Sequence, residues 1–277
     1  MNASPLYLGT SSWTWVGWEA AFYPPRTKEP DYLPFYAGRF NSVEIDGTFY
    51  RIPPAKTVQQ WRERTPEGFV FAAKLPHAIT HKKVLVDTES DLKAFLGVMD
   101  ILGPKLGPLL IQLPYFNKET FSGVDSFLQV LEPFLGSLPK DHRWAVEIRN
   151  KNWLCEKFFS VLRNHAIALT LIDHPWMPRP NKVFQLGDPI TAGFSYVRWL
   201  GDRKEIEKQT LVWDRTIIDR TSELQEWMRV LKPVQRRGVT IYAYANNHYA
   251  GFAPETVRLF NQIWVEGKLD TLGSSMA

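Results

Sequence analysis

Eight short apolar segments alternate with longer amphipathic segments along the chain, and this alternation restricts the fold more than any other feature. The apolar segments have the length of β-strands. They are Tyr7–Gly9, Ser42–Ile45, Val70–Lys74, Leu109–Gln112, Trp144–Ile148, Ala168–Ile172, Phe194–Arg198 and Thr240–Ala245. Helices are predicted between them, at Asp31–Arg39, Ala55–Arg64, Glu89–Leu102, Val124–Leu135, Cys155–Asn164, Ile217–Arg236 and Pro254–Glu266. Strands that alternate with helices pair in parallel through right-handed crossovers.

Eight strand–helix units in 277 residues predict a single (β/α)₈ TIM-like barrel domain over residues 1–277. Residues 176–192, between the sixth and seventh strands, are rich in proline and show no helical period. We therefore expect an irregular excursion there instead of a helix. An open doubly wound sheet is the alternative. The stretch GTSSWTWVG after the first strand lacks the G-x-G-x-x-G pattern of dinucleotide-binding folds, which disfavours it.

Composition indicates a soluble globular protein and sets few limits on its partners. Hydrophobic residues make up 44% of the chain, and no apolar run reaches the roughly 18 residues of a transmembrane helix. The stretch MNASPLYLGTSSW has no basic segment followed by an apolar one, so we predict no secretory signal and a cytoplasmic location. The net charge of +4 permits an anionic partner, although the basic residues are spread along the chain as on an ordinary solvated surface.

Polar residues stand at the carboxyl end of every predicted strand. In chain order they are Thr10 and Ser11, Glu44 and Asp46, Lys74, Gln112, Glu147 and Arg149, Asp173, Arg198, and Asn246 with Asn247. TIM-barrel active sites are built from these positions. Side-chain alternation places Glu44 on the opposite face of its strand from Val43 and Ile45. The charged residues of the other strands are expected to converge on the barrel axis with it, including Asp173 on the face of Leu169 and Leu171.

Glu44 and Glu147 are the predicted catalytic residues, because paired carboxylates can transfer protons when their surroundings separate their pKa values. Such a pair also serves glycosidic chemistry, where the separation decides the mechanism. Three cations, Lys74, Arg149 and Arg198, either bind an anionic substrate or neutralise these acids. Gln112, Asp173 and Asn246 are predicted to orient the substrate. The alternative is a structural charge network that closes the top of the barrel without catalysis.

Aromatic and histidine side chains in the loops after the strands are further candidates for substrate binding. Trp13, Tyr50 and Trp153 are predicted to stack on a sugar or base, or else to pack as a plug of the barrel mouth. His81 follows the third strand in ITHKK, and His174 and His248 follow two others. No tight metal-ligand spacing occurs, so we predict neither a metal nor a cofactor. The single cysteine, Cys155, is interpreted as a packing residue.

Several motifs in order resemble the YecE-like family, which is catalogued as a domain of unknown function, number 72. They are GTSSWTWVGW, FNSVEIDGTFYRIP, TPEGFVFAAKLP, ITHKKVL, KLGPLLIQLP, AVEIRNKNW, YVRWLG and YAYANNHYAG, and they extend over almost the whole chain. This resemblance implies a TIM-like barrel but no established activity. The chain departs from the family pattern at Asn150 and Asn152, where a His or similar residue and a Ser-like residue are expected, and this argues against catalysis by residue 150.

Taken together, these patterns predict an enzyme for a polar, anionic, sugar- or nucleotide-like substrate that binds at the carboxyl-terminal face of the barrel. The acid–base chemistry would be of the hydrolase or the lyase/isomerase type. Two alternatives stay open: a nucleic-acid-binding protein or phosphodiesterase resembling endonuclease IV, and a non-catalytic ligand sensor or scaffold. The sequence predicts no membrane partner and does not determine the oligomeric state.

Overall fold

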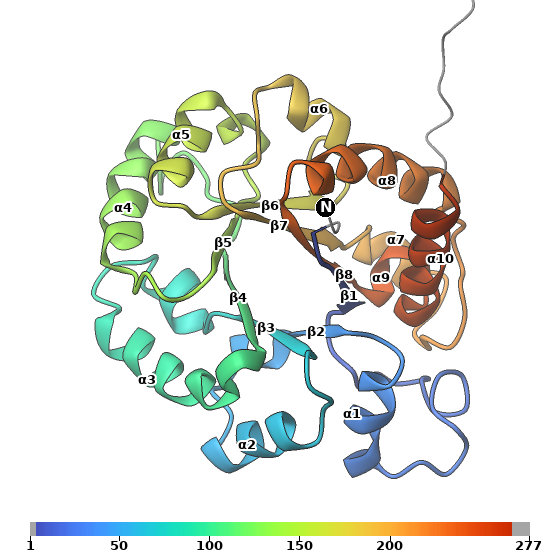
Figure 1. Cartoon of the computed structure of the whole chain (residues 1–277). Helices are drawn as coiled ribbons and strands as arrows, with labels where there is room; N and C mark the ends of the chain where they lie inside the picture. Colours follow the sequence, from blue (N-terminus) through green and yellow to red (C-terminus); the bar gives the residue numbers. More distant parts are fainter. Residues whose placement is uncertain (1–3, 268–277) are drawn as a thin grey trace, which may run out of the picture.

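Eight parallel strands form a barrel in the order β1-β8-β7-β6-β5-β4-β3-β2, with the helices around it (Figure 1). The structure is a computed structural model that describes residues 4–267. The strands are β1 (Leu6–Thr10), β2 (Ser42–Ile45), β3 (Val70–Lys74), β4 (Leu106–Gln112), β5 (Trp144–Glu147), β6 (Ala168–Asp173), β7 (Phe194–Trp199) and β8 (Thr240–Ala245). This order confirms the predicted TIM-like barrel and excludes the doubly wound sheet.

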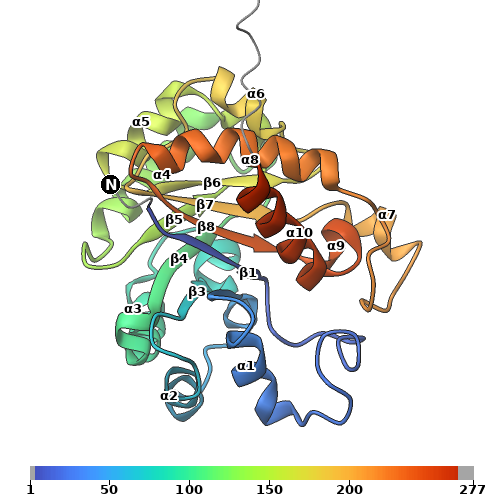
Figure 2. The same cartoon turned by 45° about the vertical axis from the view of Figure 1, so that its right-hand side comes forward.

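Residues 4–267 contain ten α-helices, and all but the three shortest lie where the amphipathic segments predict them, with ends shifted by a few residues. They are α1 (Glu29–Ala37), α2 (Ala55–Glu63), α3 (Glu89–Met99), α4 (Val124–Ser137), α5 (Glu156–Asn164), α6 (Pro180–Gln185), α7 (Arg203–Glu207), α8 (Thr221–Arg236), α9 (Asn247–Ala250) and α10 (Ala253–Glu266). The excursion after β6 contains the short helix α6, which begins at a proline. Two other short helices, α7 and α9, directly follow β7 and β8 (Figure 2). No helix within residues 4–267 is both long and apolar enough to cross a membrane.

Alternate residues of the strands form two separate hydrophobic clusters. The cluster inside the barrel contains Val70, Ala72, Leu110, Ala145, Ala168, Phe194, Tyr196, Tyr242 and Tyr244. The larger cluster, between the strands and the helices, includes Leu169 and Leu171. The predicted inward faces of β3, β5 and β7 are therefore confirmed. The predicted inward face of β6 is wrong, because Leu169 and Leu171 pack outward while Ala168 faces the axis.

Side chains, rather than a backbone ladder, close the barrel between β1 and β2. The hydroxyl of Tyr36 in α1 accepts a hydrogen bond from the Thr10 amide (2.8 Å) and donates one to the Ser42 carbonyl (3.0 Å). The Asn41 side chain accepts from the Leu8 amide (2.8 Å). A Cβ atom on Gly9 would lie only 1.9 Å from the Ser42 carbonyl oxygen. Glycine is therefore required where β1 crosses this seam.

Candidate functional site

Arg198 joins the two predicted catalytic carboxylates at the carboxyl end of the barrel interior. Its Nη2 and Nε atoms donate to Oε1 of Glu44 (2.8 and 3.2 Å), and its Nη1 atom donates to Oε2 of Glu147 (2.8 Å). Both carboxylates are fully buried, and Arg198 is almost so. The strands β2, β5 and β7 set this geometry, because each carries one of the charged side chains on its inward face, at its last or next-to-last residue. All three guanidinium nitrogens of Arg198 are thus engaged.

Three further charged side chains surround this triad on its more open side. Lys74 Nζ lies 3.4 Å from a carboxylate oxygen of Asp46, which is also 3.8 Å from Arg198 Nη2. Arg149 Nη2 lies 2.5 Å from Oε1 of Glu147. We call these six residues (Glu44, Asp46, Lys74, Glu147, Arg149 and Arg198) the charge cluster. Three acids and three bases balance one another in it, which limits the cost of burying them.

The cluster shifts the pKa values of its members in directions that follow from burial and neighbouring charge. Burial raises the pKa of Glu147, but Arg149 and Arg198 lower it by more, to about 2. Glu147 is therefore ionised at neutral pH. Burial lowers the pKa of Lys74, while Asp46 opposes this and Arg198 adds to it. The Lys74 ammonium also lies 3.8 Å from the centre of the Phe49 ring, a favourable cation–π contact.

Tyrosines inside the barrel contact the charge cluster from the side of the barrel interior. The Tyr196 hydroxyl donates to Oε2 of Glu44 at 2.6 Å. Tyr244 packs against Tyr196, with ring centres 5.2 Å apart, and its hydroxyl is 2.7 Å from Ser42 Oγ. Both oxygens of Glu44 are thus hydrogen-bonded. Tyr196 is not among the residues predicted for the site, although it stands two residues before Arg198 on the same face of β7, and this alternation points to it.

Asp173 does not join the cluster, so the prediction that its side chain points to the barrel axis is wrong. Its side chain points to the outer layer, where Oδ2 accepts from Trp227 Nε1 (2.7 Å), Tyr249 Oη (3.0 Å) and Arg179 Nη1 (2.5 Å). Asp173 lies on the same face of β6 as Leu169 and Leu171, and this face packs outward, toward the helices. Asp173 instead ties α8 and α9 to the end of β6.

The two other predicted orienting residues make local contacts. Gln112 is paired with Glu147 in the β4–β5 register and lies on the inward face of β4, and its side-chain amide donates to the Leu113 carbonyl (2.6 Å). Asn246 caps the short helix α9, since its Oδ1 accepts from the His248 amide at 3.0 Å.

The predicted aromatic residues lie in three different surroundings. Trp13 packs edge-on against Trp61, with ring centres 5.2 Å apart. Tyr50 is 79% exposed. Trp153 is buried and stacks on Phe127 at 4.7 Å, so it forms part of the packing between loops.

The histidines occupy separate contacts as well. His81 Nδ1 is 2.9 Å from Thr80 Oγ1, and its ring lies against Phe49 and His77. Burial and the charges of neighbouring groups lower its pKa to about 4. His174 Nδ1 accepts from the Trp176 amide, and His248 lies between Asn246 and Glu207. Within residues 4–267 no group of three His, Cys, Asp or Glu side chains has the arrangement of a metal site.

Two open grooves lie beside the charge cluster, one at each end. The first, of about 600 Å³, is lined by loop residues after β1 and β2, including Trp13, Asp46, Tyr50 and Trp61. The second, of about 760 Å³, is lined by residues of the loops after β4, β5 and β6, including Arg149. We call them the Asp46 groove and the Arg149 groove. Each has the volume of a small-molecule site.

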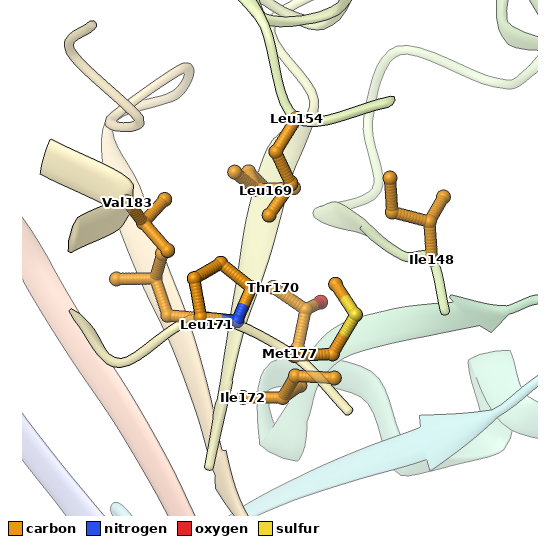
Figure 3. Close-up of a pocket in the computed structure, with 9 residues that line it drawn as sticks. Ile148, Leu154, Leu169, Thr170, Leu171, Ile172, Met177 and Val183 are labelled. Atoms are coloured by element: carbon orange, nitrogen blue, oxygen red, sulfur yellow. The ribbon is translucent and has the colours of Figure 1, made fainter. Parts of the chain in front are cut away.

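A third cavity lies outside the barrel and is too small for a ligand. Figure 3 shows its lining, which comes from β6, the loop after β5 and the excursion around Met177 and Val183. It is mostly apolar and measures about 10 Å³, which leaves room for about one water molecule. This cavity is therefore no candidate for a substrate site. A further groove of about 500 Å³, lined by residues that include Leu6, Asn41 and Trp264, contains no residue of the charge cluster.

Comparison with known proteins identifies relatives without a described activity. The family described as "Protein of unknown function DUF72" matches residues 7–274. The UPF0759 protein YecE of Escherichia coli (strain K12) is 31% identical over 151 residues, which are 54% of this chain and 51% of YecE. YunF of Bacillus subtilis (strain 168), another UPF0759 protein, is 30% identical over 163 residues, 56% of this chain and 54% of YunF. The chain thus matches about half the length of these curated relatives.

Crystal structures of two proteins from the same family share the fold. The Thermotoga maritima protein has a TM-score of 0.73 and 25% identity, and the match covers 95% of this chain and 100% of that one. The Enterococcus faecalis protein has a TM-score of 0.67 and 21% identity, with 94% and 97% covered. These similarities establish the barrel and leave its chemistry to be inferred from the site.

Proposed function

Because the chain belongs to the DUF72 family, whose description states no activity, we propose from the geometry of the site that it is an enzyme for a small, polar, anionic substrate. The substrate binds at the carboxyl-terminal mouth of the barrel, over the charge cluster. The reaction is a proton-transfer reaction of the hydrolase or the lyase/isomerase type. The convergence of Glu44, Lys74, Glu147, Arg149 and Arg198 at the end of the barrel supports this proposal.

The lysine at the end of β3 is the observation that carries the proposal. Lys74 is held by a strand rather than by a loop, and burial lowers its pKa below the ordinary value of a lysine, which favours proton transfer by an amine. Its partner Asp46 has a side chain that is 33% exposed and lines the Asp46 groove. In this proposal Lys74 and Asp46 transfer the proton, and Arg149 binds the anionic group.

In this proposal the two buried carboxylates do not transfer protons, although the sequence predicts them as the catalytic pair. Glu44 and Glu147 are covered from solvent and held by Arg198. The low pKa of Glu147 makes it a poor proton donor near neutral pH. We therefore propose that both act as fixed charges, which hold Arg198 and Arg149 in place and favour the ammonium form of Lys74.

Solvent-exchange NMR tests the proposal whatever the product of the reaction is. Wild-type protein is incubated in D₂O with mixtures of sugar phosphates and small carboxylic acids, and loss or change of proton signals is followed. We expect one compound to exchange or react, and Lys74→Met to slow this by roughly 10²–10⁴-fold, the usual contribution of a general acid or base. Lys232→Met is the matched control, because that lysine also lies on an aromatic ring, Trp264, at a remote helix. Wild-type turnover by Lys74→Met would show that the assignment is wrong.

The main alternative is a ligand-binding protein without catalysis, and the charge balance of the cluster favours it. Three acids and three bases that satisfy one another need no reaction to explain them. A compound that co-purifies with the protein and is recovered unchanged after incubation would support this function.

A nucleic-acid ligand is the remaining alternative, supported by the pI of about 9.0. It requires binding that weakens steeply with salt. Absence of binding to single-stranded or damaged DNA at low salt would contradict it.

A further inference from the structure

The Arg149 groove has a lining of aromatic and cationic side chains without an acid. Its walls come from the loops after β4, β5 and β6. Five of its lining residues are aromatic, among them Tyr115 and Trp176, three are the cations Lys118, Arg149 and Lys151, and none is acidic. A site with this composition attracts an anion and a flat, weakly polar group.

Arg149 differs from Arg198 in having donors left for a ligand. Arg198 engages all three of its nitrogens with Glu44 and Glu147. Among residues 4–267, the single polar partner of Arg149 is Glu147, which its Nη2 contacts at 2.5 Å. A guanidinium carries five N–H donors in a planar fork that matches a carboxylate or phosphate. The rest of the Arg149 fork is therefore free for an anion in the groove.

Two aromatic side chains at the rim of the groove are exposed although their neighbours are buried. Tyr115 is 63% exposed and Trp176 is 62% exposed, whereas Phe116 and Trp153 are buried. Phe116 and Trp153 stack on each other, with ring centres 6.1 Å apart, and belong to the packed wall. Tyr115 and Trp176 thus provide ring surfaces that the protein itself leaves uncovered.

Hydrogen bonds hold the walls in place before any ligand arrives. The Asn150 side chain accepts from the Phe116 amide (3.0 Å) and donates to the Phe116 carbonyl (2.8 Å), which fixes the position next to Tyr115. The Trp176 amide donates to His174 Nδ1 (3.2 Å), and the two rings meet edge-on at 5.2 Å. A preorganised wall lowers the entropy lost on binding.

We propose that the Arg149 groove binds a small ligand in which a flat ring carries a phosphate or carboxylate, with the anion on Arg149 and the ring against Tyr115 or Trp176. Lys118 and Lys151 add positive charge at the edge, and neither has an ion-pair partner within the described part of the chain. This inference rests on the proposed function, because it names the substrate class of the same site. It places the anion at the Glu147 end of the charge cluster and the reacting part of the substrate toward Lys74.

Calorimetric titration with three probes tests the inference: phenyl phosphate, benzoate and adenosine 5′-monophosphate. We expect at least one of them to bind the wild-type protein with a Kd below about 1 mM. Inorganic phosphate and adenosine, which each lack one of the two features, are expected to bind at least about tenfold more weakly. Comparison of phenyl phosphate with benzoate distinguishes the two anions. Failure of all three probes to bind below that concentration would overturn the inference.

Substitutions locate the site. Tyr115→Ala and Trp176→Ala are each expected to weaken binding of the successful probe about tenfold, since a stacked ring contributes roughly that much. Tyr50→Ala is the matched control, because Tyr50 is also exposed but lines the Asp46 groove. The Tyr50→Ala variant should bind the successful probe with the wild-type affinity. Arg149→Lys should weaken binding of the anionic probe more than binding of neutral adenosine. If Tyr50→Ala and Tyr115→Ala weakened binding of the probe equally, or if Tyr115→Ala and Trp176→Ala had no effect on it, the Arg149 groove would not be the binding site.

Lys74→Met separates this inference from the proposed function. The variant should bind the probe as the wild type does, within about threefold, while it loses the turnover measured by NMR. A probe that binds in the groove but never exchanges or reacts supports the inference and counts against the enzyme. Suppose instead that a compound is turned over in a Lys74-dependent reaction, and that Tyr115→Ala and Trp176→Ala leave this turnover unchanged. This result supports the proposed enzymatic function and overturns the proposal that the substrate binds in the Arg149 groove.

Discussion

Replacement of Arg198 by methionine should strongly destabilise the protein at neutral pH. The change leaves two fully buried carboxylates, Glu44 and Glu147, without the guanidinium that joins them. Removal of one partner from a buried ion pair costs about 3–5 kcal/mol, because the remaining charge is left uncompensated. Tyr196 still donates to Glu44 and Arg149 still contacts Glu147, so the effect should stay within this range.

The same variant should change how stability depends on pH. The pKa of Glu147 is about 2 in the folded protein, below its ordinary value of 4.5. Its contribution of about 3 kcal/mol is therefore complete above about pH 4.5 and is lost as the pH falls toward 2. Without Arg198 the pKa of Glu147 rises, because burial then opposes ionisation with one cation fewer. The free energy of unfolding of Arg198→Met should consequently fall less than that of the wild type between pH 5 and pH 2.

Urea unfolding followed by tryptophan fluorescence, at several pH values, measures both effects. Arg203→Met is the control, since Arg203 makes an exposed pair with Glu207 and should change the free energy of unfolding by about 0.5 kcal/mol or less. Addition of Glu44→Gln and Glu147→Gln to Arg198→Met should recover part of the loss. An Arg198→Met protein as stable as the wild type at pH 7, with the same pH slope, would refute the reasoning.

Three further predictions concern single contacts. Gly9→Ala should lower the free energy of unfolding by at least about 1–3 kcal/mol in urea titrations, because its Cβ would meet the Ser42 carbonyl; Gly47→Ala, which has open space around it, should not. Asn150→Ala should cost about 1–3 kcal/mol and speed amide exchange around Phe116, whose backbone groups lose their partners; unchanged exchange there would contradict this. NMR titration of His174 should give a midpoint near 4, since burial and the Arg149 charge lower its pKa, and a midpoint above 6 would show that the imidazole is not held neutral.

The sequence predicts the strands and long helices well because each is a short apolar run or a regular amphipathic stripe. It predicts β2, β3 and β8 with the bounds that the structure shows. The inward face of β6 is predicted wrongly because Leu169 and Leu171 on one face and Ala168 and Ile172 on the other are all apolar, so alternation carries no signal there. The helices α7 and α9 escape prediction because they are too short to show a period.

The site is predictable in its composition and less so in its connections. Polar strand ends place Glu44, Lys74, Glu147 and Arg198 together, as the sequence indicates. Which carboxylate meets which cation depends on strand tilt and side-chain rotamers, and no pattern in the sequence encodes these. The Arg149 groove is equally hidden, since it is assembled from three loops whose relative positions follow only from the closed barrel.

The seam between β1 and β2 makes the closure of the barrel depend on a helix. Neighbouring strands elsewhere in the barrel can join through backbone hydrogen bonds alone, one residue after the next. At the seam, the Thr10 amide and the Ser42 carbonyl meet only through the hydroxyl of Tyr36, which α1 delivers. Closure of the barrel at this seam therefore depends on the docking of α1, together with the contact of Asn41 with the Leu8 amide. Detachment of α1 would leave the Thr10 amide and the Ser42 carbonyl without this shared partner.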